Sequence, residues 1–171
     1  GRFRGMKEQF QGEGFRVAPK LVDTSAIIDG RFADLFRLAG REQAALNTLG
    51  EGLALVPDNP DLHYARGLAL VRSQQLPEAV EALARAAGLQ AENAQYTYVY
   101  AVALDAAGET GKAIEVLERY HENAQNNQQI LSALVSFTRK AGDTAQAERY
   151  EQQLLELQGA RTNSVKEVAD R

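Results

Sequence analysis

The segment PDLHYARGLALVRSQQLPEAVEALARAAGLQAEN, residues 60–93, decides the fold because its pattern recurs along the chain. Segments at 26–59, 94–127 and 128–161 keep the same spacing of 34 residues, and no gap is needed to align them. A fixed period of this length indicates stacked supersecondary units, in which each unit buries its apolar face against the next. The sequence therefore predicts one repeat array over most of the chain.

Each unit has a regular pattern of small and large residues. Small residues at the eighth and twentieth positions would let two helices approach closely, and apolar residues at the eleventh and twenty-fourth positions would pack around them. The eighth and twentieth positions hold Ala33, Gly67, Ala101, Val135, Ala45, Ala79, Ala113 and Ala147. The eleventh and twenty-fourth hold Phe36, Leu70, Leu104, Thr138, Leu49, Leu83, Leu117 and Glu151. Two packed helices per unit follow from this pattern.

Turn signals divide the units at the expected places. The fifteenth position holds Gly40, Gln74, Gly108 and Gly142, and a glycine there can end a helix in the left-handed conformation. Three units end in Asn59, Asn93 and Asn127, which are typical helix N-caps. Local alternation of Tyr96, Tyr98 and Tyr100 favours a strand, but the repeat register places them in a helix. We expect the register to prevail.

This pattern resembles the tetratricopeptide repeat, a helix-turn-helix unit of 34 residues. The resemblance implies an all-α fold, a right-handed superhelix or α-solenoid of about four units. The expected domain spans 25–161, after a partly flexible N-terminal extension at 1–24 and before a tail or short capping helix at 162–171. Ser164 and Glu167 form a weak capping box that supports such a helix.

Composition excludes several classes of function. The net charge of −4 and the pI near 5.3 argue against nucleic-acid binding, which usually needs a basic patch. The absence of cysteine excludes thiol nucleophiles and haem-attachment motifs, and it fits cytoplasm and periplasm alike. No apolar run is long enough to cross a membrane, so membrane insertion is not expected.

One stretch suggests an enzyme. The segment KLVDTSAIIDGRFADLF, residues 20–36, resembles the opening motif of PIN-domain nucleases. That resemblance implies a metal-dependent ribonuclease using Asp23 and Asp29 as metal-binding acids. Such a site needs further carboxylates from later strands of a parallel sheet, but a helical repeat register begins inside the motif. We therefore expect no catalytic, cofactor or metal site, with Asp23, Thr24 or Ser25 capping the first repeat helix.

Tetratricopeptide arrays bind partners in a groove lined by the first helices of their units. By family resemblance, fixed positions of each unit face that groove, and some of these aliphatic residues could instead pack between helices. The predicted groove residues are Arg37, Tyr64, Leu68, Arg72, Tyr98, Val102, Asp105, Arg139 and Lys140. Asp34, Leu38, Val71, Ser132 and Ser136 occupy the same set of positions.

These residues predict a non-catalytic interaction scaffold. Its groove would have an apolar and tyrosine floor with basic ends, suited to a peptide with apolar anchors and some acidic residues. Self-association through the ends of the array is a further alternative. The middle of the chain is also similar to repeat arrays that follow multihaem cytochrome domains, which implies a bacterial cytoplasmic or periplasmic protein.

Overall fold

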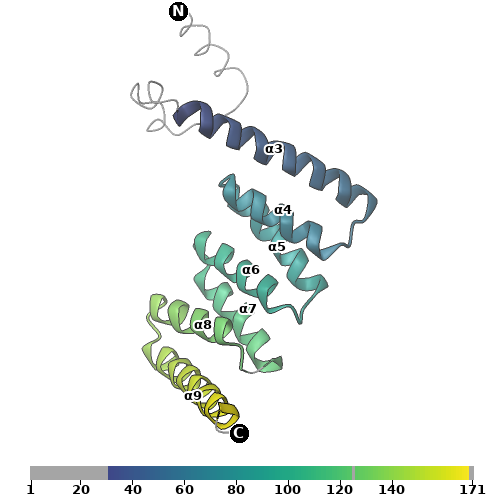
Figure 1. The fold of residues 1–171 in the computed structure, drawn as a ribbon. Helices are drawn as coiled ribbons and strands as arrows, with labels where there is room; N and C mark the ends of the chain where they lie inside the picture. Colours follow the sequence, from purple (N-terminus) through teal and green to yellow (C-terminus); the bar gives the residue numbers. More distant parts are fainter. Residues whose placement is uncertain (1–30, 125, 170–171) are drawn as a thin grey trace, which may run out of the picture. The chain divides into compact units, whose positions relative to one another are not determined.

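The computed structural model describes residues 31–124 and 126–169, and it describes side chains from residue 40 to residue 164 apart from residue 125. Seven helices and no strand occur within these ranges, which confirms the all-α prediction (Figure 1). The helices are α3 (Arg31–Leu55), α4 (Pro60–Arg72), α5 (Leu76–Leu89), α6 (Ala94–Ala106), α7 (Thr110–Asn123), α8 (Gln128–Lys140) and α9 (Thr144–Ala169).

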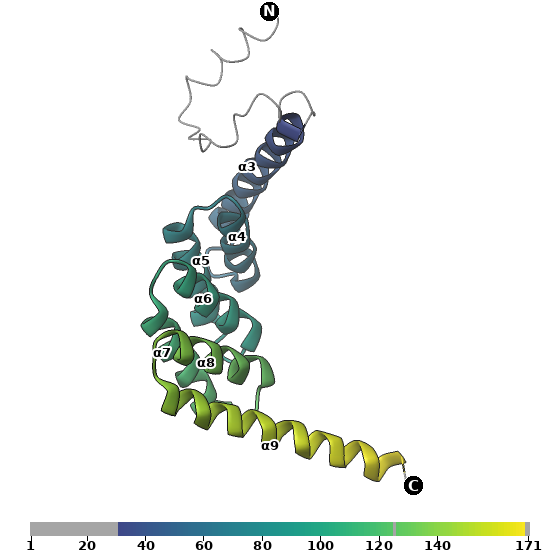
Figure 2. The same ribbon diagram turned by 90° about the vertical axis from the view of Figure 1, so that its left-hand side faces the viewer.

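Residues 44–171 form one compact unit, and this unit contains the three helix pairs from α4 to α9. Within it, α4 packs on α5, α6 on α7 and α8 on α9, while α5 contacts α6 and α7 contacts α8. Figures 1 and 2 show these helices side by side in chain order. The first helices α6 and α8 also touch directly, which brings residues about 34 positions apart next to each other.

Asparagine side chains start three of these helices, as the sequence predicts. The Oδ1 atom of Asn59 accepts a hydrogen bond of 3.0 Å from the backbone N–H of Leu62. Asn127 accepts one of 3.1 Å from Ile130, and Asn93 caps α6 in the same way. Each cap satisfies a backbone donor that the first helical turn leaves unpaired. The caps fix where α4, α6 and α8 begin.

The turns inside the three helix pairs share one backbone conformation. Gln74, Gly108 and Gly142 all have positive φ angles, of 59°, 85° and 86°. In each turn the following residue donates a backbone hydrogen bond to a carbonyl in the last turn of the first helix, as Gln75 does to the carbonyl of Leu70 at 2.9 Å. Gln74 thus adopts the left-handed conformation that glycine adopts in the other two units.

This conformation makes Gln74 a site for stabilisation. Replacing Gln74 with glycine is expected to raise the free energy of unfolding by about 0.5–1 kcal/mol, because only glycine takes a positive φ without steric cost. Urea denaturation followed by circular dichroism measures the change. Gln75→Gly is the matched control, because Gln75 has a φ of −93°. The same change at this position should lower the free energy of unfolding slightly. A loss of stability in Gln74→Gly would contradict the prediction.

The turn expected at Gly40 is not formed. Helix α3 runs without a break through Gly40 as far as Leu55. Gly142 is followed by Asp143, whose side chain caps α9 by accepting a bond of 2.9 Å from the backbone N–H of Gln146. Gly40 is followed instead by the helix-forming run Arg-Glu-Gln-Ala at 41–44, which offers no such cap. Strong helix formers therefore follow Gly40 directly, and the glycine alone does not end the helix.

The separate C-terminal helix is not formed either. Helix α9 continues to Ala169, so Ser164 lies inside it rather than at a helix start. No proline interrupts the residues from Leu155 to Ser164, and neither Gly159 nor Asn163 ends the helix. Figure 2 shows the last turns of α9 running past α8.

The core lies between the helix pairs. A cluster of buried side chains joins α6, α7 and α8, and Leu117, Ile130 and Leu134 in it are completely inaccessible to solvent. Tyr96 is 7% exposed and belongs to α6, so the helical register does prevail over the local strand pattern. Burial of one face of α6 leaves its other positions to line surface pockets.

Candidate functional site

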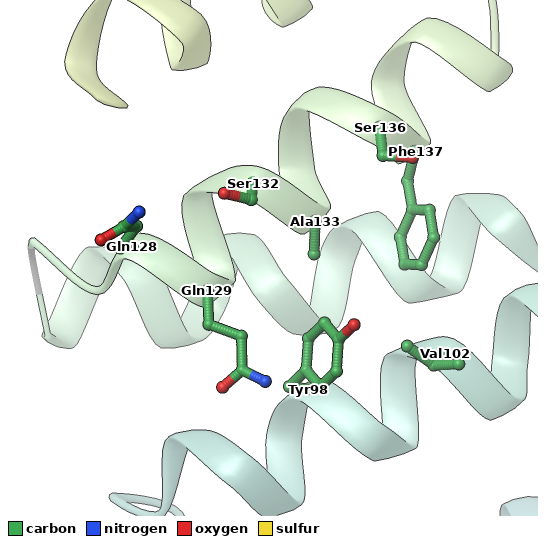
Figure 3. Close-up of a pocket in the computed structure, with 8 residues that line it drawn as sticks. All are labelled: Tyr98, Val102, Gln128, Gln129, Ser132, Ala133, Ser136 and Phe137. Carbon is green, nitrogen blue, oxygen red and sulfur yellow. The ribbon is translucent and has the colours of Figure 1, made fainter. Parts of the chain in front are cut away.

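A pocket of about 540 Å³ lies between the first helices α6 and α8. Helix α6 contributes Tyr98 and Val102, which reach towards Ala133 and Phe137 on α8 (Figure 3). The remaining lining residues are Gln128, Gln129, Ser132 and Ser136, all from α8. This α6/α8 pocket brings together the predicted groove residues Tyr98 and Val102 with Ser132 and Ser136, which occupy the same set of repeat positions.

The floor of the α6/α8 pocket is anchored in the core. Phe137 is 9% exposed and Ala133 6%, and both belong to the buried cluster, against which Tyr98 packs. Val102 is 40% exposed, so much of its side chain faces the pocket opening or solvent. A firm apolar floor with one exposed aliphatic residue suits an apolar side chain from outside.

The wall on α8 is polar and uncharged. Ser132, Ser136 and Gln129 are exposed, and their side chains make no hydrogen bond to any other described residue. Gln128 is engaged, since its Oε1 atom accepts a bond of 3.1 Å from Arg161. The free hydroxyl and amide groups can donate to or accept from an external polypeptide backbone.

The predicted basic end of the groove is neutralised by its own acids. Lys140 Nζ lies 2.7 Å from one carboxylate oxygen of Asp105 and 2.8 Å from the other. Thr110 donates a further hydrogen bond of 2.6 Å to Asp105. Burial would raise the pKa of Asp105, but the hydrogen bonds from Lys140 and Thr110 outweigh it and lower that pKa below its usual value. Asp105 and Lys140 therefore form a pair at neutral pH.

The other predicted cations are distributed differently. Arg139 forms an ion pair of 2.6 Å with Glu151 on α9. Arg72 is exposed at the end of α4, and it too has an interaction partner. Arg37 lies in α3, where the structure describes the backbone and not the side chain. Acidic groups of a partner would have to compete for Arg139 and Lys140.

Tyr64 and Leu68 are half-buried on α4 and do not line the α6/α8 pocket. The ring of Tyr64 stacks on that of Tyr96, with centroids 4.5 Å apart. Tyr96 donates a short hydrogen bond to Asp61, and this bond, together with burial, raises the pKa of Tyr96 to about 12. These contacts give Tyr64 a packing role between α4 and α6.

Sequence reasoning missed part of the α6/α8 pocket. Gln129 occupies the second position of its unit, one of the positions expected to face the groove, so the register could have found it. Phe137 carried no such signal, because an aromatic residue on a helix usually indicates core. It does belong to the core, and it forms the pocket floor as well.

No group of three or more histidine or acidic residues placed to hold a metal occurs in the described part of the chain. Among the described helices, none is long and apolar enough to cross a membrane. Asp23 and Asp29, which the nuclease alternative needs, lie outside the described residues. The α6/α8 pocket offers surface for binding, lined by apolar and neutral polar groups.

Comparisons with known proteins identify the repeat. A family model described as tetratricopeptide repeat matches residues 64–127, and a second, described as TPR repeat, matches residues 33–74. Together they span more than half of the 171 residues. No curated protein matches the chain.

Solved structures show the same fold. A crystal structure of MamA is 21% identical, with a TM-score of 0.65 and coverage of 78% of each chain. MamA 41-end from Desulfovibrio magneticus RS-1 is 18% identical, with a TM-score of 0.62 and coverage of 76% of this chain and 73% of that one. With two repeat models, this shared fold and the helix pairs in register, the chain belongs to the tetratricopeptide repeat family, whose arrays serve as protein-interaction scaffolds.

Proposed function

We propose that this chain is a non-catalytic interaction module that holds a segment of a partner protein in the α6/α8 pocket. The observation that carries the proposal is the pocket itself, which combines a core-anchored apolar floor with unpaired polar groups on α8. An apolar side chain of the partner would enter beside Tyr98 and Val102. Ser132, Ser136 and Gln129 would hydrogen-bond to the partner's backbone.

Apolar contact, rather than charge, is the proposed main source of affinity. Binding energy at protein interfaces concentrates in a few anchors that fill desolvated pockets. Lys140 and Arg139 are engaged with Asp105 and Glu151, so each acidic group of the partner would first have to displace an ion pair. Exposed ion pairs of this kind contribute little free energy. Replacing an ion pair within the chain by one with the partner would therefore add little to the binding free energy.

A blocking substitution tests the proposal. Peptides are selected from a phage-displayed random library on the purified full chain, and their affinities are measured by fluorescence anisotropy. Ser132→Trp places a large ring on the exposed wall of the pocket without touching the core. It should weaken binding of the selected peptides about tenfold or more, because the ring occupies the anchor's place.

Ala145→Trp is the matched control, because Ala145 is exposed on α9 and does not line the pocket. It should bind the peptides as the wild type does. The proposal is wrong if Ser132→Trp binds them with unchanged affinity, or if no peptide is selected on the folded wild-type chain. Circular dichroism of both variants shows whether the helices are intact.

A further inference from the structure

A second cavity, of about 560 Å³, lies among α5, α6 and α7 and shares no lining residue with the α6/α8 pocket. We call it the α5–α7 pocket. Small residues of α5, among them Ala84, Ala87 and Gly88, form one wall, and Val116 on α7 lies in another. A cavity of this size with apolar walls falls in the range of ligand sites, which is about 300–1,000 Å³.

The repeat supplies an internal comparison for this cavity. The next interval of the array is the space between α7 and α9, 34 residues further along the chain. The chain's own side chains occupy that interval. Tyr150 donates a hydrogen bond of 2.8 Å to Glu118. His121 Nε2 lies 2.9 Å from Gln153 Oε1, and its ring meets that of Tyr150 edge to face at 6.0 Å.

In the α5–α7 pocket all four of these residues are replaced. Ala84 stands at the position of Glu118, Ala87 at that of His121, Val116 at that of Tyr150 and Arg119 at that of Gln153. Protein interiors are close-packed, so the loss of a phenol ring and its hydrogen-bonding neighbour leaves room for an external group of similar size. The ring and hydroxyl of Tyr150 thus have no counterpart at Val116, while Tyr100 and Tyr120 line the cavity where the later positions hold Leu134 and Leu154.

A polar group inside the cavity points to the same chemistry. Thr97 lines the cavity and is 5% exposed, and its hydroxyl has no hydrogen-bond partner among the described residues. Its counterpart in the next unit is the apolar Leu131, which is 1% exposed. The hydroxyl is open to the cavity, so it can donate a hydrogen bond to, or accept one from, an occupant that carries its own hydroxyl.

We propose that the α5–α7 pocket receives a tyrosine side chain of a partner protein. The phenol ring lies against Ala84 and Ala87, and its hydroxyl bonds to Thr97. Tyr100 and Tyr120 also line the cavity and can contact the ring in the offset or edge-on geometry that aromatic pairs favour. The site is separate from the α6/α8 pocket, so each can be tested without the other.

Titration of the isotope-labelled full chain, followed by NMR of the backbone amides, tests this site. The probes are N-acetyl-tyrosinamide, N-acetyl-phenylalaninamide and free 4-methylphenol. The tyrosine probe should shift the signals of Ala84, Gly88, Thr97 and Val116 at millimolar concentration. The phenylalanine probe should bind several-fold more weakly because it leaves Thr97 unpaired.

Two variants close the cavity with pairs taken from the chain itself. Ala84→Glu with Val116→Tyr copies Glu118 and Tyr150, and Ala87→His with Arg119→Gln copies His121 and Gln153. Each should weaken the tyrosine probe about tenfold without lowering the melting temperature, because it fills space that the next interval already fills. If one variant fails to fold, the other still decides.

Ala145→Tyr is the control, because Ala145 is exposed on α9 and lines neither pocket, and it should leave binding of the tyrosine probe unchanged. The proposal is overturned if both folded closing variants bind the probe like the wild type, or if no signal of the pocket shifts. Equal binding of the phenylalanine probe would overturn the role of Thr97. Tighter binding of 4-methylphenol than of the capped tyrosine would overturn the assignment to a protein side chain.

Discussion

Replacing Gly67 with alanine is expected to lower the free energy of unfolding by about 2 kcal/mol, which corresponds to a fall in melting temperature of roughly 6 °C. Gly67 is buried where α4 and α5 cross. A methyl group built on it would lie 2.5 Å from Cγ of Leu83 and 2.6 Å from one of its terminal carbons. Leu83 is fully buried, so it cannot move aside without disturbing its neighbours.

Gly88→Ala is the matched control for this prediction. Gly88 lies in α5, and an added methyl group there would meet nothing within 4 Å. That change should stabilise the helix by about 0.5 kcal/mol, because alanine is the better helix former. The two variants thus make the same chemical change with opposite expected signs. Thermal denaturation followed by circular dichroism measures both.

A second substitution identifies the cause. If the clash with Leu83 is responsible, Leu83→Ala should cost less in the Gly67→Ala background than in the wild type, because the two side chains then no longer compete for one space. Additive effects would show that Gly67 acts through its backbone rather than through close packing. A stabilising effect of Gly67→Ala alone would contradict the prediction directly.

The sequence predicted the helix pairs well where several local signals agree with the period. Asn93 as a cap, Gly108 as a turn and buried Leu104 and Leu117 all specify the same unit. At Gly40 the period stood alone, because strong helix formers at 41–44 follow the glycine, and the helix continues. A repeat register predicts position in the array, whereas a turn also needs its own local chemistry.

The pockets were harder to predict, for a physical reason. The register predicts that Tyr98 and Val102 face the groove, but a pocket forms only where several side chains together leave space. Ion pairing across units was equally hidden, since Asp105 and Lys140 are 35 positions apart and meet because α6 lies beside α8. The α5–α7 pocket arises from small residues, such as Ala84 and Ala87, that appear as ordinary helix formers in sequence.

The largest loss of stability is expected for Leu117→Ala, at about 3 kcal/mol. Leu117 on α7 is completely buried in the cluster that also holds Leu104 of α6 and Leu134 of α8. Truncation would leave a cavity at the point where two successive units meet, and such a cavity adds to the loss of apolar burial. The urea midpoint should fall accordingly.

Leu155→Ala is the control, because Leu155 on α9 is 62% exposed and its truncation should change stability by no more than about 0.5 kcal/mol. Hydrogen exchange adds a spatial readout to the comparison. The stability of a repeat array is approximately the sum of unit stabilities and contacts between neighbours. Leu117→Ala should therefore increase exchange most in α6, α7 and α8 and least in α4 and α5. A uniform increase in hydrogen exchange along the array would mean that the array unfolds as a single unit. Equal free energies of unfolding for Leu117→Ala and Leu155→Ala would mean that Leu117 is not part of a packed core.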